Sequence, residues 1–250
     1  MSKDLYNKGM ECFSYFSKGW CDVRNNKKLY FDIWRKANFT GLIKCYIKAF
    51  ELYGRDGIAE GFGKQMDEIL PDGRGTYDGS TKDWRSAYTI SREFAIYRES
   101  QTGFELSSLA KACSESKITA SKYLANYLLN FNQLINGQVV HPFKKVLELF
   151  QSQNDSITKD QIGDILEFNL NIATPASKRQ QVNNFCNRIA GSGLLLTTGA
   201  NGNHILIGTR YSLQDLLNAC RVWEGTVEEF QEMNQDGYID MISSPNKLIM

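Results

Sequence analysis

The chain has 250 residues, of which 42% are hydrophobic, 23% charged and 12% aromatic. This ordinary globular mixture excludes disordered, collagen-like and low-complexity classes of protein. The longest apolar runs, such as Gly193–Leu196, are far shorter than the roughly 20 residues that cross a bilayer. The N-terminal residues are polar and charged, so we expect a cytoplasmic protein with neither a membrane span nor a secretory signal.

Cysteine and histidine are too sparse and too scattered for a metal centre. Six cysteines are present, none of them in a Cys-x-x-Cys pair, and the two histidines are His141 and His204. A zinc site or a dense disulfide framework would need closer groups of these residues. The pattern favours reduced, mostly buried thiols, as is usual in the cytoplasm, and we expect no metal or cofactor.

The formal net charge of +1 hides three segments of different character. Residues 1–48 hold ten lysines and arginines against four acids, and residues 174–213 hold four basic residues and no acid. Residues 224–240 hold six acids and no basic residue. Such segregation is compatible with a surface that binds a polyanion beside an acidic tail, or with a solvated surface that happens to be uneven.

Helical periodicity dominates the first half of the chain. Aromatic and aliphatic residues crowd one side of residues 29–53, and glycine-containing turns separate this segment from the next. The expected elements are helices over 29–53, 58–70 and 81–94, a loop over 72–80, and a short hairpin with arms Phe94–Tyr97 and Phe104–Leu106 around Gln101–Gly103. Ser107 or Ser108 would cap the segment that follows the hairpin.

The second half of the chain is also helical, with one clear hairpin. Apolar residues at helical spacing predict the helices, and Asn201-Gly202 between two apolar runs predicts the hairpin. The helices are expected over Ile118–Phe131, around Phe143–Phe150 and Ile162–Leu166, over Pro175–Ala190, and around Leu213–Cys220, the last firm helix. The hairpin arms are expected at Leu194–Thr198 and His204–Gly208, and Asn136-Gly137 marks a further turn.

Three helices followed by a two-stranded hairpin form the order of a winged helix, a helix-turn-helix with a β wing. This order is clearest at residues 143–211, and a weaker copy fits residues 58–109. The predicted fold is mainly α with short β-hairpin wings, in tandem winged-helix domains. The predicted organisation is a basic helical region over 1–57, a first winged-helix-like domain over 58–135, and a second over 136–250 with a C-terminal helix and an acidic tail.

Three stretches of the sequence resemble the DNA-binding part of certain type II restriction endonucleases. They are Phe94–Ala112 (FAIYRESQTGFELSSLAKA), Lys122–Phe131 (KYLANYLLNF), and His141-Pro142-Phe143 leading into Val146–Leu149. The family is the AlwI, PleI and BstNBI group, which cleaves or nicks beside an asymmetric site. Ala110 stands where that group tends to have glycine. The resemblance implies tandem winged helices that dock on duplex DNA, with the nuclease in a separate domain or subunit.

The helix predicted over Pro175–Ala190 carries the residues best suited to reading bases. Its buried side is set by four apolar residues, Val182, Phe185, Cys186 and Ile189. At roughly 100° per residue, the outer side is expected to hold an amide-rich group, Gln180, Asn183, Asn184 and Asn187. Amide side chains suit adenine. The alternative is a solvent-facing helix whose amides bind nothing.

Basic and wing residues near this helix suit the DNA backbone. Lys178 and Arg179 lie in its first turn, where the helix dipole already favours phosphate. Asn201 and His204 belong to the predicted wing, from which they would contact the adjacent backbone or the minor groove.

Two earlier groups complete the predicted DNA-binding set. Arg85, Thr89 and Arg92 fall on one side of the helix predicted over 81–94, where arginine would pair with guanine or bind phosphate or nearby acids. Arg24, Lys27 and Lys28 lie in a polar loop and would contact phosphates regardless of sequence.

A nuclease of this kind would hold Mg²⁺ with an acid and a later acid-x-Lys motif. The sequence offers only Asp72 with Glu115 and Lys117, which are expected in polar turns rather than on a rigid element. We therefore assign no catalytic or metal-binding residue, and expect no catalytic activity from this chain alone. If it has any, the class would be a Mg²⁺-dependent endonuclease.

The sequence favours sequence-specific recognition of double-stranded DNA, as the target-recognition module or subunit of a restriction endonuclease. Its expected partners are duplex DNA and a nuclease domain or subunit, without a membrane. One alternative is an autonomous winged-helix regulator or anti-phage accessory protein. Another is a winged-helix scaffold that binds proteins and no DNA, since one fold serves many functions.

Overall fold

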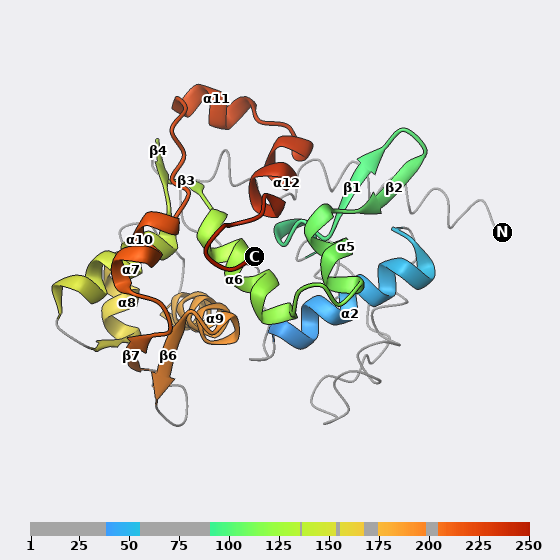
Figure 1. Ribbon diagram of the computed structural model, residues 1–250. Coiled ribbons are helices and arrows are strands. Elements are labelled where there is room, and N and C mark those ends of the chain that lie inside the picture. Colours follow the sequence, from blue (N-terminus) through green and yellow to red (C-terminus); the bar gives the residue numbers. More distant parts are fainter. Residues whose placement is uncertain (1–38, 56–90, 136, 154–155, 168–174, 199–204) are drawn as a thin grey trace.

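The computed structural model describes residues 39–55, 91–135, 137–153, 156–167, 175–198 and 205–250 (Figure 1). Its helices are α2 (Phe39–Tyr53), α5 (Ser108–Ser114), α6 (Ala120–Asn130), α7 (Pro142–Ser152), α8 (Lys159–Glu167), α9 (Pro175–Ser192), α10 (Leu213–Ala219), α11 (Val227–Glu232) and α12 (Gln235–Ser243). Its strands are β1 (Tyr97–Ser100), β2 (Gly103–Leu106), β3 (Gln133–Ile135), β4 (Gln138–Val140), β5 (Ile157–Thr158), β6 (Leu195–Thr198) and β7 (Ile205–Thr209). The predicted class, mainly helical with short hairpins, is confirmed.

All strand pairs in the described part are antiparallel, and the sheets are small. β1 pairs with β2, and β3 pairs with β4. The third sheet has the order β5-β7-β6, because the two-residue β5 adds to the β6–β7 hairpin along β7. In chain order this unit reads α7, β5, α8, α9, β6, β7.

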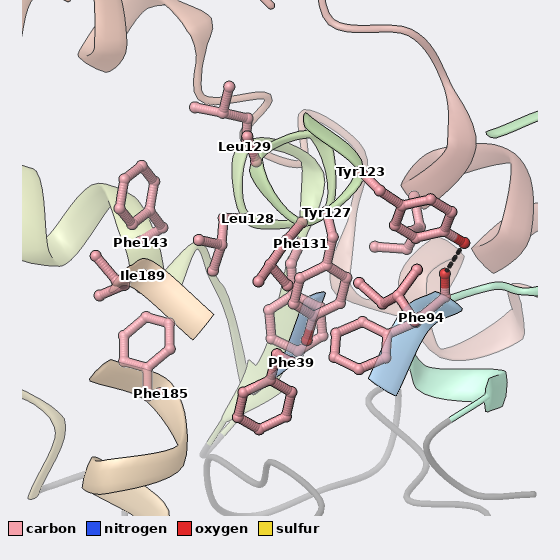
Figure 2. Packing of buried hydrophobic residues seen from close by; sticks show 14 of the residues in the cluster. Phe39, Phe94, Tyr123, Tyr127, Leu128, Leu129, Phe131, Phe143, Phe185 and Ile189 are labelled. Carbon is pink, nitrogen blue, oxygen red and sulfur yellow. Dashed lines mark hydrogen bonds between the residues drawn. The ribbon is translucent and has the colours of Figure 1, made fainter. Parts of the chain in front are cut away.

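Helix α6 forms the centre of the hydrophobic core. Every residue from Tyr123 to Asn130 is buried, and α6 contacts α2, α5, α7, α9 and α12. Leu128 points toward the side of Phe143 and Ile189, whereas Tyr127 points toward Phe39 and Phe94 (Figure 2). A helix that is covered all round in this way belongs to the interior of a domain.

Helix α9 packs closely against α6 and α2. One close approach is at Gly191, where an added Cβ would lie 2.9 Å from Leu124 Cδ2 and 3.7 Å from Thr40 Cγ2. The lack of a side chain at Gly191 therefore lets α9 lie close to α6 and α2. The four apolar residues predicted to set the buried side of α9 are all buried, Val182, Phe185, Cys186 and Ile189.

The first hairpin differs from its prediction in one arm. Its strand β1 begins at Tyr97, not at Phe94, because the chain first makes a buried turn in which Ala95 has a φ of 54°. The hydroxyl of Tyr123 donates to the carbonyl of Phe94 at 2.7 Å and holds this turn on α6. The predicted cap after the hairpin is confirmed, since the hydroxyl of Ser107 accepts from the backbone N–H of Ala110.

Two helices follow α10, so the prediction that the helix around Leu213–Cys220 is the last firm one was wrong. Thr226 and Glu229 form a reciprocal capping box that starts α11, and the side chain of Asn234 caps α12. The acidic segment therefore forms helices, and α12 packs against α6 and β1. Among the helices that the structure describes, none is both long and apolar enough to span a membrane.

Candidate nucleic-acid interface

Among the side chains of α9 that the structure describes, a narrow polar strip reaches the surface. Arg179 is exposed, and Asn183 and Asn187 are half-buried. These residues follow one another at i, i+4 and i+8, so they lie along one side of the helix. The first turn of α9 contains no acid. The strip can present a guanidinium group and two amide groups to a partner.

The expected outward position of Asn184 is wrong. Asn184 is only 3% exposed, and Gln181 on the adjoining part of α9 is equally buried. Asn184 lies seven residues before Gly191 and so on the same side of α9, the side on which Gly191 meets Leu124 and Thr40. Packing of α9 against α6 and α2 therefore buries a side of the helix that the apolar pattern predicted to face solvent.

A buried ion pair lies on the covered side of α9. The Nη2 atom of Arg188 lies 2.7 Å from Oε1 of Glu93, and the guanidinium of Arg188 also lies over the ring of Phe39, 4.5 Å from its centroid. The hydroxyl of Tyr127 donates to the same Oε1 atom at 2.8 Å. Glu93 thereby connects α6 with α9.

Further contacts extend this cluster to the C-terminal helix. The hydroxyl of Tyr238 in α12 donates to the backbone carbonyl of Glu93 at 2.7 Å. Burial, together with the negative charge of Glu93, raises the pKa of Tyr127, so this phenol stays neutral and acts as a hydrogen-bond donor. The cluster lies in the interior and connects α6, α9 and α12 through Glu93, so its role is structural. The sequence pattern did not point to it.

Only some of the other predicted DNA-binding residues lie in the part of the chain that the structure describes. The half-buried Arg92 directly precedes Glu93. The backbone of Lys178 and Gln180 lies in α9, but their side chains are outside the described part. The remaining predicted contacts lie outside the described residues, namely Arg24, Lys27, Lys28, Arg85, Thr89, Asn201 and His204.

The weak catalytic motif is only partly described. Nζ of Lys117 lies 2.7 Å from Oε2 of Glu115, and this hydrogen bond lowers the pKa of the Glu115 carboxyl. Asp72 lies outside the described residues, so the convergence of the three stays a prediction. Among the described residues there is no group of three or more histidines, cysteines or acids that could hold a metal ion.

The chain was compared with models of protein families and with curated proteins. No family model matches it, and the search of curated proteins finds no match.

Proposed function

We propose that this chain recognises a specific sequence of double-stranded DNA, as the target-recognition module or subunit of a restriction endonuclease. The observation that carries the proposal is the acid-free α9 with its exposed strip of Arg179, Asn183 and Asn187. Arginine can bond guanine O6 and N7, and asparagine can bond adenine N6 and N7. These three residues would contact base edges in the major groove.

The order of elements around α9 supports the proposal. A winged helix places a short strand between its first two helices and ends in a hairpin, and its recognition helix directly precedes that hairpin. The order α7, β5, α8, α9, β6, β7 and the sheet order β5-β7-β6 fit this plan. On this interpretation α9 is the recognition helix and the β6–β7 hairpin is the wing. The β1–β2 hairpin would belong to a first, earlier winged helix.

One observation favours the scaffold alternative. Gln181, Asn184 and Arg188 are buried together with the apolar side of α9. Over residues 181–192, where every side chain is described, most of the circumference of α9 is therefore covered by protein. A helix with so narrow an exposed strip offers few side chains to a groove. A winged-helix scaffold that binds a protein partner would tolerate this burial equally well.

The test is an electrophoretic selection of random duplex DNA by the 250-residue chain, with and without Mg²⁺. Enrichment of one sequence without cleavage is the expected result. Cleavage by the isolated chain would overturn the role restricted to recognition. The absence of any shifted duplex in either buffer would contradict DNA recognition and favour the scaffold alternative.

A further inference from the structure

We infer that exposed lysines on α2, on α5 and directly after α5 form a second surface that contacts the phosphate backbone of the same duplex, independently of its sequence. We name it the lysine face, and it consists of Lys44, Lys48, Lys111 and Lys117, all of which are exposed. The inference rests on the proposed function and extends it from α9 to a larger electrostatic footprint. None of these four residues belongs to the contact set that the sequence predicted.

The two helices bring these lysines to one side of the molecule. Lys44 and Lys48 lie one turn apart on the solvent side of α2, and Glu51 continues the same strip. The hydroxyl of Ser114 at the end of α5 donates to the Glu51 carboxylate, which places α5 beside this strip. Lys111 lies one turn before Ser114 on the same helix.

The four lysines of this face outnumber the two acids beside them, Glu51 and Glu115. Lys117 pairs with Glu115. Within the part of the chain that the structure describes, no ion pair holds Lys44, Lys48 or Lys111. Free ammonium groups of this kind attract phosphate, and each phosphate contact releases condensed counterions from DNA.

The lysine face begins near the candidate reading helix. The Thr40 side chain of α2 lies beside Gly191 of α9. Lys44 and Lys48 follow Thr40 by one and two helical turns. At 1.5 Å per residue they lie about 6 and 12 Å further along α2. The strip of α9 lies about 6 Å (Asn187) to 18 Å (Arg179) from Gly191 along the helix. A duplex of B-DNA carries a phosphate about every 3.4 Å along each strand, so a duplex of about ten base pairs is long enough to span both regions.

The acidic helix α11 favours the same placement of the duplex. It holds Glu228, Glu229 and Glu232 and no basic residue, whereas the two acids of α12, Asp236 and Asp240, pair with Arg98. In Figure 1, α11 lies at the top of the molecule, whereas α2 and α9 lie in its lower half. A polyanion is repelled from the first region and attracted to the second, so the charge distribution would orient it on approach.

The test compares two double variants that remove the same charge. Lys48→Gln/Lys111→Gln alters the lysine face, and Lys145→Gln/Lys247→Gln alters exposed lysines of α7 and the C-terminal segment. Affinity for the selected duplex and for an unrelated duplex is measured over a range of salt concentrations. The first variant should flatten the slope of log K against log salt by about 2, weaken both duplexes alike, and unfold at the same temperature as the parent. The second should leave the slope unchanged.

An unchanged slope for the first variant, or an equal change for both, would overturn the inference. Binding of the parent chain to vesicles that contain phosphatidylserine but not to duplex DNA would also overturn it. If the parent binds every duplex equally and only the first variant flattens the slope, the lysine face stands and sequence-specific recognition fails. If the parent prefers one sequence and neither variant alters the slope, recognition stands and the lysine face fails.

Discussion

The guanidinium of Arg188 donates a 2.7 Å hydrogen bond to the carboxylate of Glu93, 95 residues earlier in the chain. The Arg188 side chain is fully buried and that of Glu93 is 10% exposed. This pair lies between α9 and the segment that leads into the β1–β2 hairpin. It therefore joins α9 to the segment that precedes the β1–β2 hairpin.

Replacement of Arg188 should destabilise the fold strongly. Arg188→Met removes the buried cationic partner of the Glu93 carboxylate, which keeps the hydrogen bond from the Tyr127 hydroxyl. Breaking one partner of a buried ion pair costs about 3–5 kcal/mol, so we expect a loss of this size in the free energy of unfolding. Urea denaturation at neutral pH measures it.

The matched control is the double variant Glu93→Gln/Arg188→Met, which removes both charges. Because both charges of the Arg188–Glu93 pair are then removed, we expect it to recover part of the stability lost in Arg188→Met. The single variant Glu93→Gln is measured as well. If the stability lost in the double variant equals the sum of the losses in the two single variants, the two residues are not coupled.

Stability should fall in mild acid because of His141. Its Nε2 atom lies 3.0 Å from the Leu129 carbonyl, and its Nδ1 atom accepts from the backbone N–H of Lys144 at 3.1 Å. Burial lowers the pKa of His141 to about 4 from an ordinary value of 6.5. The folded state thus binds the proton less tightly than the unfolded state does, and stability is lost as the pH falls from about 6.5 to 4.

The full loss from this residue is about 3 kcal/mol, at about 1.4 kcal/mol per pH unit. His141→Asn keeps a side chain that can cap α7 but does not titrate in this range. The unfolding free energies of parent and variant are compared from pH 7 to pH 4.5. As the pH falls, the variant should lose less stability than the parent. A difference that stays constant with pH would contradict the assignment.

Buried amides hold the C-terminal segment on α6. The Nδ2 atoms of Asn126 and Asn130 both donate to the carbonyls of Ile242 and Ser244, and Oδ1 of Asn126 accepts from the N–H of Asn246. Asn126→Ala leaves that buried N–H without this acceptor, so we expect a loss of about 1–3 kcal/mol in urea denaturation. Asn218→Ala, on the exposed side of α10, should change stability by no more than about 0.5 kcal/mol.

The two amides should also be coupled. Each single variant leaves one amide to satisfy the two shared carbonyls. The double variant Asn126→Ala/Asn130→Ala removes both amide donors, so that the Ser244 carbonyl keeps the Arg221 guanidinium and the Ile242 carbonyl loses both side-chain donors. The double variant should therefore lose more stability than the sum of the singles, by about 0.5–3 kcal/mol. Strict additivity would mean that the carbonyls are satisfied in another way.

Much of the local structure could be predicted from the sequence. The apolar spacing in α9 is a local property of the chain, and it identified both the helix and its four buried apolar residues. A reciprocal Thr226 and Glu229 pair before an apolar position is likewise a readable start signal, yet α11 was not predicted. The two-residue strand β5 was also missed, because its pairing with β7 depends on a distant segment.

The burial of polar residues could not be predicted in the same way. Polar side chains lie at the surface in most proteins, so Asn184 was placed outward. Its burial depends on α2 and α6, which are distant from it in sequence. Glu93, the partner of Arg188, is likewise distant in sequence. The lysine face has the same origin, since α2 and α5 meet only in the folded chain.

The proposal that α9 reads DNA is tested most sharply by the affinities of α9 variants for every single-base-pair change of the selected duplex. Asn183→Ala or Asn187→Ala should cost about 1–3 kcal/mol in binding and relax discrimination at one or two positions, whereas the control Asn218→Ala should bind the whole panel as the parent does. Arg179→Ala should relax a guanine position if it reads a base, or weaken all duplexes evenly if it binds phosphate. If all three strip variants bind the panel as the parent does, α9 does not read DNA and the account is contradicted.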